Sequence, residues 1–129
     1  MEITADTHAL IWYLTADKKL SKKAKIVFDE IIKNRKRLII SIIVLMEVLS
    51  LIEKKRLKFT WEEFNQKISE FPNLIIYPAG MDVLEVMKNV GETLELHDRI
   101  LVATAIIHKA VIISKDPEIS SLKEIESVW

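Results

Sequence analysis

Short apolar segments of strand character alternate along this chain with segments whose apolar residues recur at helical spacing. Such alternation is typical of strand–helix–strand units, which build a mostly parallel sheet with helices packed on its faces. We therefore expect a single α/β domain over residues 1–129, with a central sheet of four or five strands flanked by helices. The predicted strands are Glu2–Ala5, Leu38–Ile40, Leu74–Tyr77, Val111–Ile113 and a weaker edge strand at Ser127–Val128.

Three of the helices are marked by capping residues or by a stripe of apolar side chains. Ser21 is placed to cap a helix that carries Ala24, Phe28 and Ile31 on one face. Thr60 and Glu63 form a capping box ahead of the next helix. A further stripe predicts a helix that ends near Gly91, and its members are Val83, Val86, Met87, Val90 and Leu94.

The composition excludes several classes of protein. The chain has no cysteine, so it contains no disulfide, zinc thiolate or iron–sulfur cluster. Its longest apolar stretch, Leu38–Met46, falls well short of the roughly 20 residues that span a membrane. The N-terminus lacks a basic segment followed by an apolar one, so we expect no secretory signal and a cytoplasmic location.

The net charge is zero, but the two halves of the chain differ in sign. Residues 1–60 contain 13 Lys and Arg against 7 Asp and Glu, whereas residues 61–129 contain 6 against 12. A basic half of this kind can follow a phosphate backbone. Solvated helix faces are a slightly better account of each single lysine cluster, so charge alone does not identify a nucleic-acid-binding protein.

Four carboxylates lie within or beside apolar runs, and they are Asp6, Glu47, Asp98 and Asp116. Asp6 and Asp116 follow predicted strands, which places them at the sheet edge where ligands bind. Asp98 begins a helical segment, and Glu47 lies about a turn and a half into the helix after the second strand. If the four converge, their repulsion calls for a divalent cation, and hard cations such as Mg²⁺ prefer oxygen ligands. The pattern predicts a metal site.

Three of these carboxylates also have a purely structural interpretation. Asp6 and Asp98 could cap the helices that follow them, where a negative charge favours the helix dipole. Asp116 precedes Pro117 and could be a turn residue. We favour the site, because coincidence is a poor account of four carboxylates that all adjoin strand ends or the neighbouring helices.

Glu47 interrupts a helix that is apolar on nearly every side, which predicts a buried helix. Its structural alternative is a narrow solvated stripe with Ser50 and Lys54. The apolar residues of this helix and of the helix Thr7–Leu14 could instead form an interface, although burial in the core is the better expectation.

Histidine and tryptophan are weaker candidates. His97 beside Asp98 resembles a metal-binding dipeptide, but scattered histidines more often serve in packing or on the surface. We therefore leave all three histidines out of the ligand set: His8, His97 and His108. The tryptophans lie among apolar residues and are expected in the core or at an interface, with base stacking as the alternative, and they are Trp12, Trp61 and Trp129.

Four segments match a known pattern in order and spacing: Ala5–Trp12, Ser41–Val48, Leu96–Ala105 and Ile113–Asp116. Together they resemble PIN-domain proteins, and specifically the VapC toxin ribonucleases of type II toxin–antitoxin systems. The stretch from His97 to Ala105 is the most specific part, and the resemblance extends over nearly the whole chain.

The resemblance implies a single PIN-like domain with metal-dependent endoribonuclease activity and an acidic quartet that holds one or two Mg²⁺ or Mn²⁺ ions. By position, the metal ligands and catalytic residues are Asp6, Glu47, Asp98 and Asp116. Ser114 occupies the hydroxyl position before the last acid, and Glu95 is a candidate outer-shell carboxylate, although Leu96 follows it where relatives commonly have Pro. The resemblance also implies an RNA substrate, a VapB-like antitoxin and a homodimer.

Two alternatives stay open at this stage. A phosphoacceptor signalling domain is also a parallel α/β fold with an acidic Mg²⁺ pocket, but it needs paired acids after the first strand and an acceptor Asp after the third. Here Thr7 follows Asp6, and the third strand ends at Tyr77 and Pro78. A non-catalytic PIN-like binding module would keep the carboxylates for structural reasons alone, and cleavage in the presence of metal, with EDTA as control, separates it from a nuclease.

Overall fold

The computed structural model describes residues 1–129 and contains one sheet of five strands, all parallel. The strand order is β3-β2-β1-β4-β5, and the strands are β1 (Glu2–Ala5), β2 (Arg37–Ser41), β3 (Ile75–Tyr77), β4 (Val111–Ile113) and β5 (Glu126–Val128). All five predicted strands are confirmed, two of them at both ends and the other three with ends that differ by one residue. The order differs from that of the flavodoxin-like phosphoacceptor domains, which excludes that alternative.

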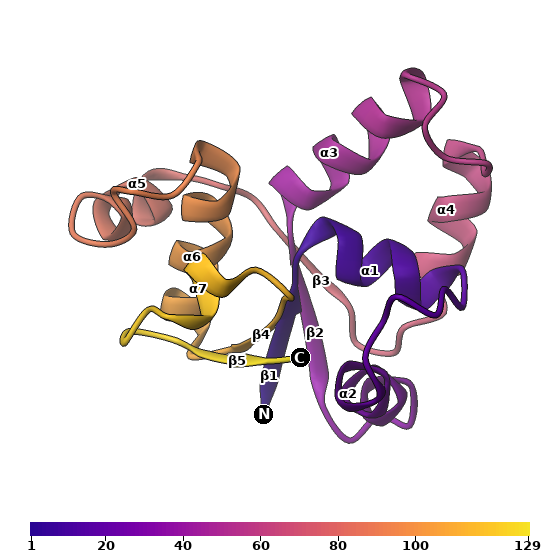
Figure 1. Ribbon diagram of the computed structural model, residues 1–129, viewed down its shortest axis with the longest axis horizontal. Helices are drawn as coiled ribbons and strands as arrows, with labels where there is room; N and C mark the ends of the chain where they lie inside the picture. Colours follow the sequence, from indigo (N-terminus) through magenta and orange to yellow (C-terminus); the bar gives the residue numbers. More distant parts are fainter.

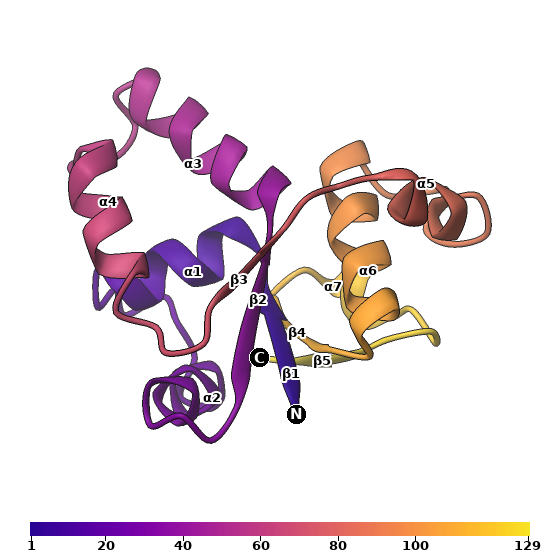
Figure 2. The same cartoon turned by 180° about the vertical axis from the view of Figure 1, so that it is seen from behind.

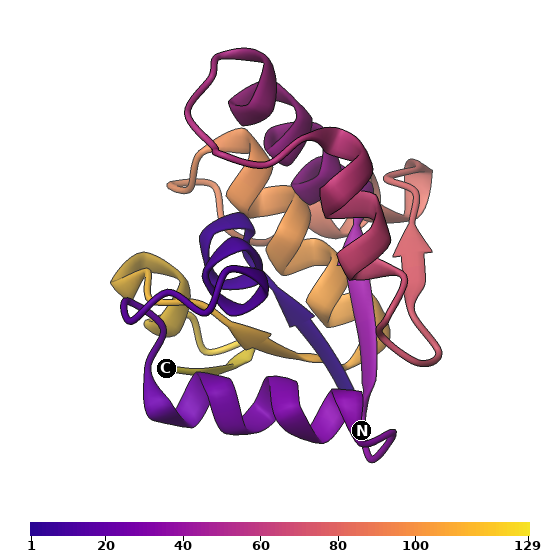
Figure 3. The same ribbon diagram turned by 90° about the vertical axis from the view of Figure 1, so that its right-hand side faces the viewer.

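Seven helices surround the sheet (Figures 1 and 2), and they are α1 (Thr7–Leu14), α2 (Lys22–Ile32), α3 (Ile42–Glu53), α4 (Trp61–Ile68), α5 (Met81–Met87), α6 (Leu96–His108) and α7 (Pro117–Ser120). In Figure 1, α1 and α2 lie on one side of the sheet and α6 lies on the other, with α5 packed outside α6. Figure 3 shows that α1 and α3 leave the same end of β1 and β2. This end is the carboxyl edge of the parallel sheet.

Helix starts follow the capping signals of the sequence. The Ser21 hydroxyl accepts a hydrogen bond of 3.1 Å from the Ala24 amide at the start of α2. Thr60 and Glu63 form the complete capping box at α4, with side chain and backbone bonded in both directions. Ser41 ends β2 and caps α3, so strand and helix join without a loop and Glu47 stands close to the sheet edge.

The core has two parts. A main cluster of 24 buried residues joins the sheet to the helices packed on it. Its central strands contribute side chains that are fully buried, among them Ile3, Leu38, Ile40 and Ile112. A smaller cluster of Val83, Met87 and Ala103 fixes α5 against α6. Helices on both sides of the carboxyl edge are therefore packed into the core.

The predicted helix that ends near Gly91 is shorter than expected. Helix α5 stops at Met87, and Gly91 adopts φ of +72°, a conformation that favours glycine over other residues. Leu94 continues the apolar stripe and is 6% exposed, because the turn after α5 folds back onto the main core. The apolar spacing predicted burial correctly and helix length wrongly.

The expectation that α3 is buried is also wrong. Only Val44 and Val48 are buried, while Met46 and Leu49 are 55% and 40% exposed. The helix crosses the end of the sheet and meets α1, α6 and β2 along one side, which leaves its opposite side without a partner. By contrast, the apolar residues Ala9, Leu10 and Ile11 of α1 are buried as expected.

Candidate metal centre

A cleft of about 570 Å³ opens at the carboxyl edge of the sheet, between α1 and α3 on one side and α6 on the other. All four predicted carboxylates line it, and they are Asp6, Glu47, Asp98 and Asp116. They come from the end of β1, the middle of α3, the first turn of α6 and the residue before α7. Residues more than 100 positions apart in the sequence therefore face one cavity.

Asp6 is held by two hydrogen bonds at the end of β1. Its Oδ1 accepts from the Ala9 amide at 2.8 Å, so it does cap α1, and its Oδ2 accepts from the Ser114 hydroxyl at 2.5 Å. Loss of hydration on burial raises the pKa of Asp6, whereas these two bonds and His8 act in the opposite direction and Glu47 adds to the rise. The structural and metal-binding interpretations of Asp6 are thus compatible.

Ser114 connects the two strand ends that carry the acids. Its side chain is buried, and its hydroxyl donates to Asp6 while accepting a 3.1 Å hydrogen bond from the Asp116 amide. Asp116 in turn caps α7 through a 2.9 Å bond from the Glu118 amide to Oδ1. One hydroxyl therefore fixes the spacing between the carboxylate of β1 and the segment after β4.

Glu47 faces the cleft rather than solvent. Its Oε1 accepts a 2.8 Å hydrogen bond from the hydroxyl of Thr7, which is 3% exposed and lies 40 positions earlier in the chain. The solvated-stripe alternative does not describe this side chain, since Glu47 is half-buried and contacts α1. Thr7 was not among the candidates from sequence, because nothing in the local pattern pairs it with a residue of another helix.

Asp98 lies in the first turn of α6 and accepts no hydrogen bond, so its predicted capping alternative does not occur. Burial is the main reason that its pKa is raised, with Asp116, Glu47 and Asp6 adding to the rise and His97 opposing it. The negative charges of the other three acids therefore act on the Asp98 carboxylate in the cleft.

No lysine or arginine nitrogen lies within 4.0 Å of any of the four carboxylates. Enclosed carboxylates without a compensating charge are costly to ionise, and oxygen donors of this type are those that Mg²⁺ and Mn²⁺ select. The donor set thus fits a divalent cation. The four carboxylates are spaced more widely than ligands around a single ion. The one group of three or more metal-binding donors within 4.8 Å of one another is Glu95, His97 and Asp98.

The cleft wall also contains residues that the sequence did not place at the site. His8 and His97, which we left out of the ligand set, both line the cleft, as does the exposed Lys115. Trp12 is half-buried there and meets the edge of Trp129 with ring centres 5.8 Å apart. Sequence spacing finds Asp6 and Asp116 because they follow strands, but it gives no signal for neighbouring side chains that come from the helix faces.

The pKa values predict how metal removal alters the pH dependence of stability. Asp6 and Asp98 have raised pKa values in the folded protein, so they hold protons more firmly there than in the unfolded chain. The stability that these two groups add to the folded protein is fully present below their pKa in the unfolded chain, near 3.8. It is lost as the pH rises through their pKa in the folded protein. We expect Asp98→Asn, measured in EDTA, to gain thermal stability over the wild type as pH rises from below this value to neutrality.

The readout is the difference in Tm between variant and wild type at each pH. Glu2 and Asp29 have lowered pKa values, because they bond to Arg37 and Lys25, and they act in the opposite direction in both proteins. A difference in Tm that stays constant across the acid range would contradict the raised pKa of Asp98.

The PIN domain family profile matches residues 3–125. Similar solved structures include VapBC2 from Rickettsia felis bound to promoter DNA, at 16% identity and a TM-score of 0.73, with 99% of this chain and 98% of that chain covered. A toxin–antitoxin complex from Klebsiella pneumoniae matches at 20% identity and a TM-score of 0.68, with 98% and 96% covered. DNA-bound VapBC from Salmonella typhimurium matches at 14% identity and a TM-score of 0.71, with 99% and 97% covered.

No curated protein matches the chain at a significant level. At the identities above, the solved structures establish a common fold. The parallel sheet with its acidic carboxyl edge, together with a profile match over almost the whole length, defines the class: the chain belongs to the PIN domain family. No helix has both the length and the apolar character needed to cross a membrane.

Proposed function

We propose that this protein is a metal-dependent endoribonuclease, the toxin of a VapBC-type toxin–antitoxin system, acting in the cytoplasm. The observation that carries the proposal is the convergence of Asp6, Glu47, Asp98 and Asp116 on one cleft, with no lysine or arginine nitrogen within 4.0 Å of any of them. Membership of the PIN domain family and the fold shared with VapBC toxin–antitoxin complexes support it.

We give the four carboxylates two roles, which are metal binding and the positioning of the attacking water. We assign Asp6, Asp98 and Asp116 mainly to metal binding, and Glu47 to metal binding or to positioning the attacking water. One or two Mg²⁺ or Mn²⁺ ions bound here would supply an activated water and neutralise charge on the phosphate and leaving oxygens. Glu95 and Ser114 remain auxiliary residues in this scheme, Ser114 through its bond to Asp6.

Preorganisation of these side chains is what the protein itself contributes. Both oxygens of Asp6 are held, by Ala9 and Ser114, so this carboxylate keeps one orientation as the reaction proceeds. Thr7 holds Oε1 of Glu47 and leaves Oε2 without a hydrogen bond, free to face a metal ion or to accept a proton from water. The exposed Lys115 at the rim adds a positive charge for a phosphate of the RNA.

We propose that exposed apolar side chains form the contacts with two protein partners. Met46 and Leu49 lie on the helix that carries Glu47, so a VapB-like antitoxin bound there would adjoin the cleft. Met81 and Leu84 of α5 are 68% and 48% exposed on the other side of the molecule and are assigned to a homodimer contact. The support for the antitoxin is that similar structures are VapBC and toxin–antitoxin complexes.

Metal removal is the test of the proposed reaction. Purified protein, free of antitoxin, should cleave RNA internally with Mn²⁺ or Mg²⁺, lose cleavage in EDTA and regain it when metal is restored in excess. A total RNA pool keeps the assay independent of the unknown target. Failure to cleave with either metal, despite measurable metal binding, would instead favour the non-catalytic binding module. Cleavage that persists in EDTA would overturn the metal-dependent mechanism.

A further inference from the structure

We propose that His97, together with Glu95 and Asp98, supplies a mixed nitrogen and oxygen ligand set at the α6 wall of the cleft, so that the centre prefers Mn²⁺ to Mg²⁺. The proposal deepens the function proposed above and rests on it. It adds an imidazole to a site that the family pattern describes by carboxylates, and it reverses our exclusion of His97 from the ligands.

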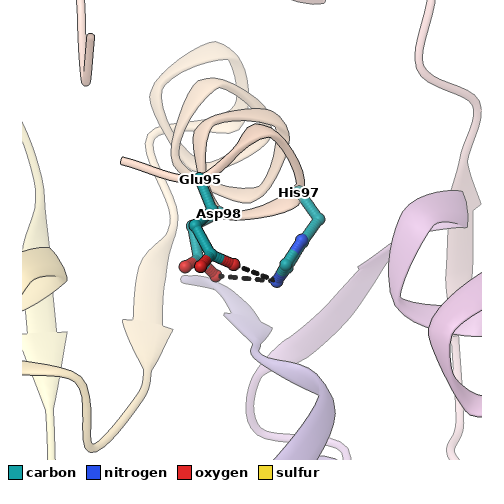
Figure 4. A group of neighbouring side chains, drawn as sticks. All are labelled: Glu95, His97 and Asp98. Atoms are coloured by element: carbon teal, nitrogen blue, oxygen red, sulfur yellow. Dashed lines mark ion pairs between the residues drawn. The ribbon is translucent and has the colours of Figure 1, made fainter. Parts of the chain in front are cut away.

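The geometry is drawn in Figure 4. The Nε2 atom of His97 lies 3.7 Å from Oε2 of Glu95 and 3.9 Å from Oδ1 of Asp98. These separations are too long for hydrogen bonds. Two ligands that each lie about 2.1 Å from one ion are about 3 to 4.2 Å apart, so both separations match ligands that share an ion.

The three side chains converge at the start of α6, where Glu95 is the N-cap residue and His97 and Asp98 lie in the first turn. All their ligand atoms lie within 4.8 Å of one another, and Figure 4 shows the imidazole and both carboxylates directed to the same side of the helix. Exposure of the side chain falls from 79% for Glu95 to 40% for His97 and 22% for Asp98. The group therefore runs from solvent into the cleft, which gives an ion a route of entry.

Asp98 provides the independent reason to place a ligand here. It is the most enclosed of the three, yet neither of its oxygens accepts a hydrogen bond, in contrast to both oxygens of Asp6. Asp98 also faces the negative charges of the other cleft carboxylates. A half-buried acid with unused lone pairs, an imidazole beside it and repulsion on its other side fits a cation better than it fits packing.

The turn before α6 is anchored, which keeps this arrangement in place. Arg99 donates a hydrogen bond to the carbonyl of Met87 at the end of α5, and its own amide bonds to the Glu95 carbonyl at 3.0 Å. Its aliphatic stem also lies 3.5 Å from the position that a Cβ would take at Gly91. Glu95 and His97 are thus presented from a fixed helix start rather than from a free loop.

Metal preference follows from the nitrogen donor. Mg²⁺ selects oxygen ligands, whereas imidazole suits the transition metals, whose affinities rise along the series that begins with Mn²⁺. Removal of His97 should therefore weaken Mn²⁺ binding and leave Mg²⁺ binding almost unchanged. Loss of supporting groups at metal sites costs tenfold or more in affinity, so we expect a decrease of at least about tenfold for Mn²⁺.

The experiment compares His97→Gln with His108→Gln in the full-length protein. His108 is on the same helix but at its other end, where its Nδ1 contacts the Thr104 carbonyl and its ring packs on Tyr77. Titration calorimetry with Mn²⁺ and with Mg²⁺ gives the affinities. Pulsed electron paramagnetic resonance of bound Mn²⁺ detects coupling to a ¹⁴N nucleus, which reports a bound imidazole directly and needs no RNA.

We expect ¹⁴N coupling in the wild type and in His108→Gln, and none in His97→Gln, with the selective loss of Mn²⁺ affinity. Glu95→Gln, which changes only an exposed side chain, should weaken Mn²⁺ binding while keeping the coupling. Tight Mn²⁺ binding without ¹⁴N coupling in the wild type would overturn the role of His97 and leave the carboxylate nuclease intact. Absence of metal binding in the wild type would overturn both.

Discussion

Asp98→Asn is expected to lower metal-dependent RNA cleavage by at least about a thousandfold, which corresponds to about 4 kcal/mol of transition-state stabilisation. The amide keeps the size of the side chain but loses the charge that attracts a cation. Asp98 has no hydrogen-bonding partner to lose, so the change in activity isolates its role toward the metal. The same loss is expected for Asp6→Asn, although that change also alters the bond from Ser114.

The measurement is the initial rate of RNA cleavage in Mn²⁺ and in Mg²⁺, with folding checked by circular dichroism. Glu124→Gln is a matched control, because Glu124 is exposed and takes part in no ion pair or side-chain hydrogen bond. The control should retain wild-type rates. Full metal-dependent cleavage by Asp98→Asn would remove Asp98 from the catalytic set and with it the proposed site.

Phe28→Ala is expected to lower the free energy of unfolding by about 3 to 5 kcal/mol. Phe28 of α2 is fully buried, and its ring stacks on Tyr13 of α1 with centres 4.4 Å apart and a tilt of 14°. Phe71 closes the group at 6.3 Å from Phe28. Truncation would leave a cavity where α1 and α2 pack together in the main core cluster.

Urea denaturation followed by far-ultraviolet circular dichroism gives the free energy of unfolding. Ile26→Ala on the same helix is the control, since Ile26 is 57% exposed and its truncation should change stability by less than about 1 kcal/mol. Equal effects of the two substitutions would show that α2 does not contribute to the core through Phe28. Neither residue lies in the cleft, so metal affinity should be unchanged in both.

Sequence reasoning located most of the sheet and the acidic residues for physical reasons. Strands such as Val111–Ile113 are buried on both faces and therefore appear as continuous apolar runs. Ser21 and Thr60 cap helices through bonds to residues three positions away, so their signal is local. Asp6 and Asp116 were found because they follow such strands, and the topology then places them at one edge.

Contacts between distant residues could not be predicted in the same way. Thr7 and Glu47 are 40 positions apart, and Ser114 and Asp6 are 108 apart, so no local pattern pairs them. The exposure of Met46 depends on how α3 crosses the sheet end, which its apolar sequence does not encode. His97 was the nearest to detection, because it adjoins Asp98 in the chain, but convergence with Glu95 required the structure.

The pairing of β1 with β4 has a consequence for the synthesis of this protein. Of the four cleft carboxylates, the first is synthesised at residue 6 and the last at residue 116, and the hydroxyl that bonds to Asp6 and to the Asp116 amide is at residue 114. Domains fold as units during translation, and contacts distant in sequence form late. Until residues 114–116 have been synthesised and β4 has paired with β1, the chain therefore lacks a complete acidic cleft, so the proposed metal centre can form only after most of the domain has been made.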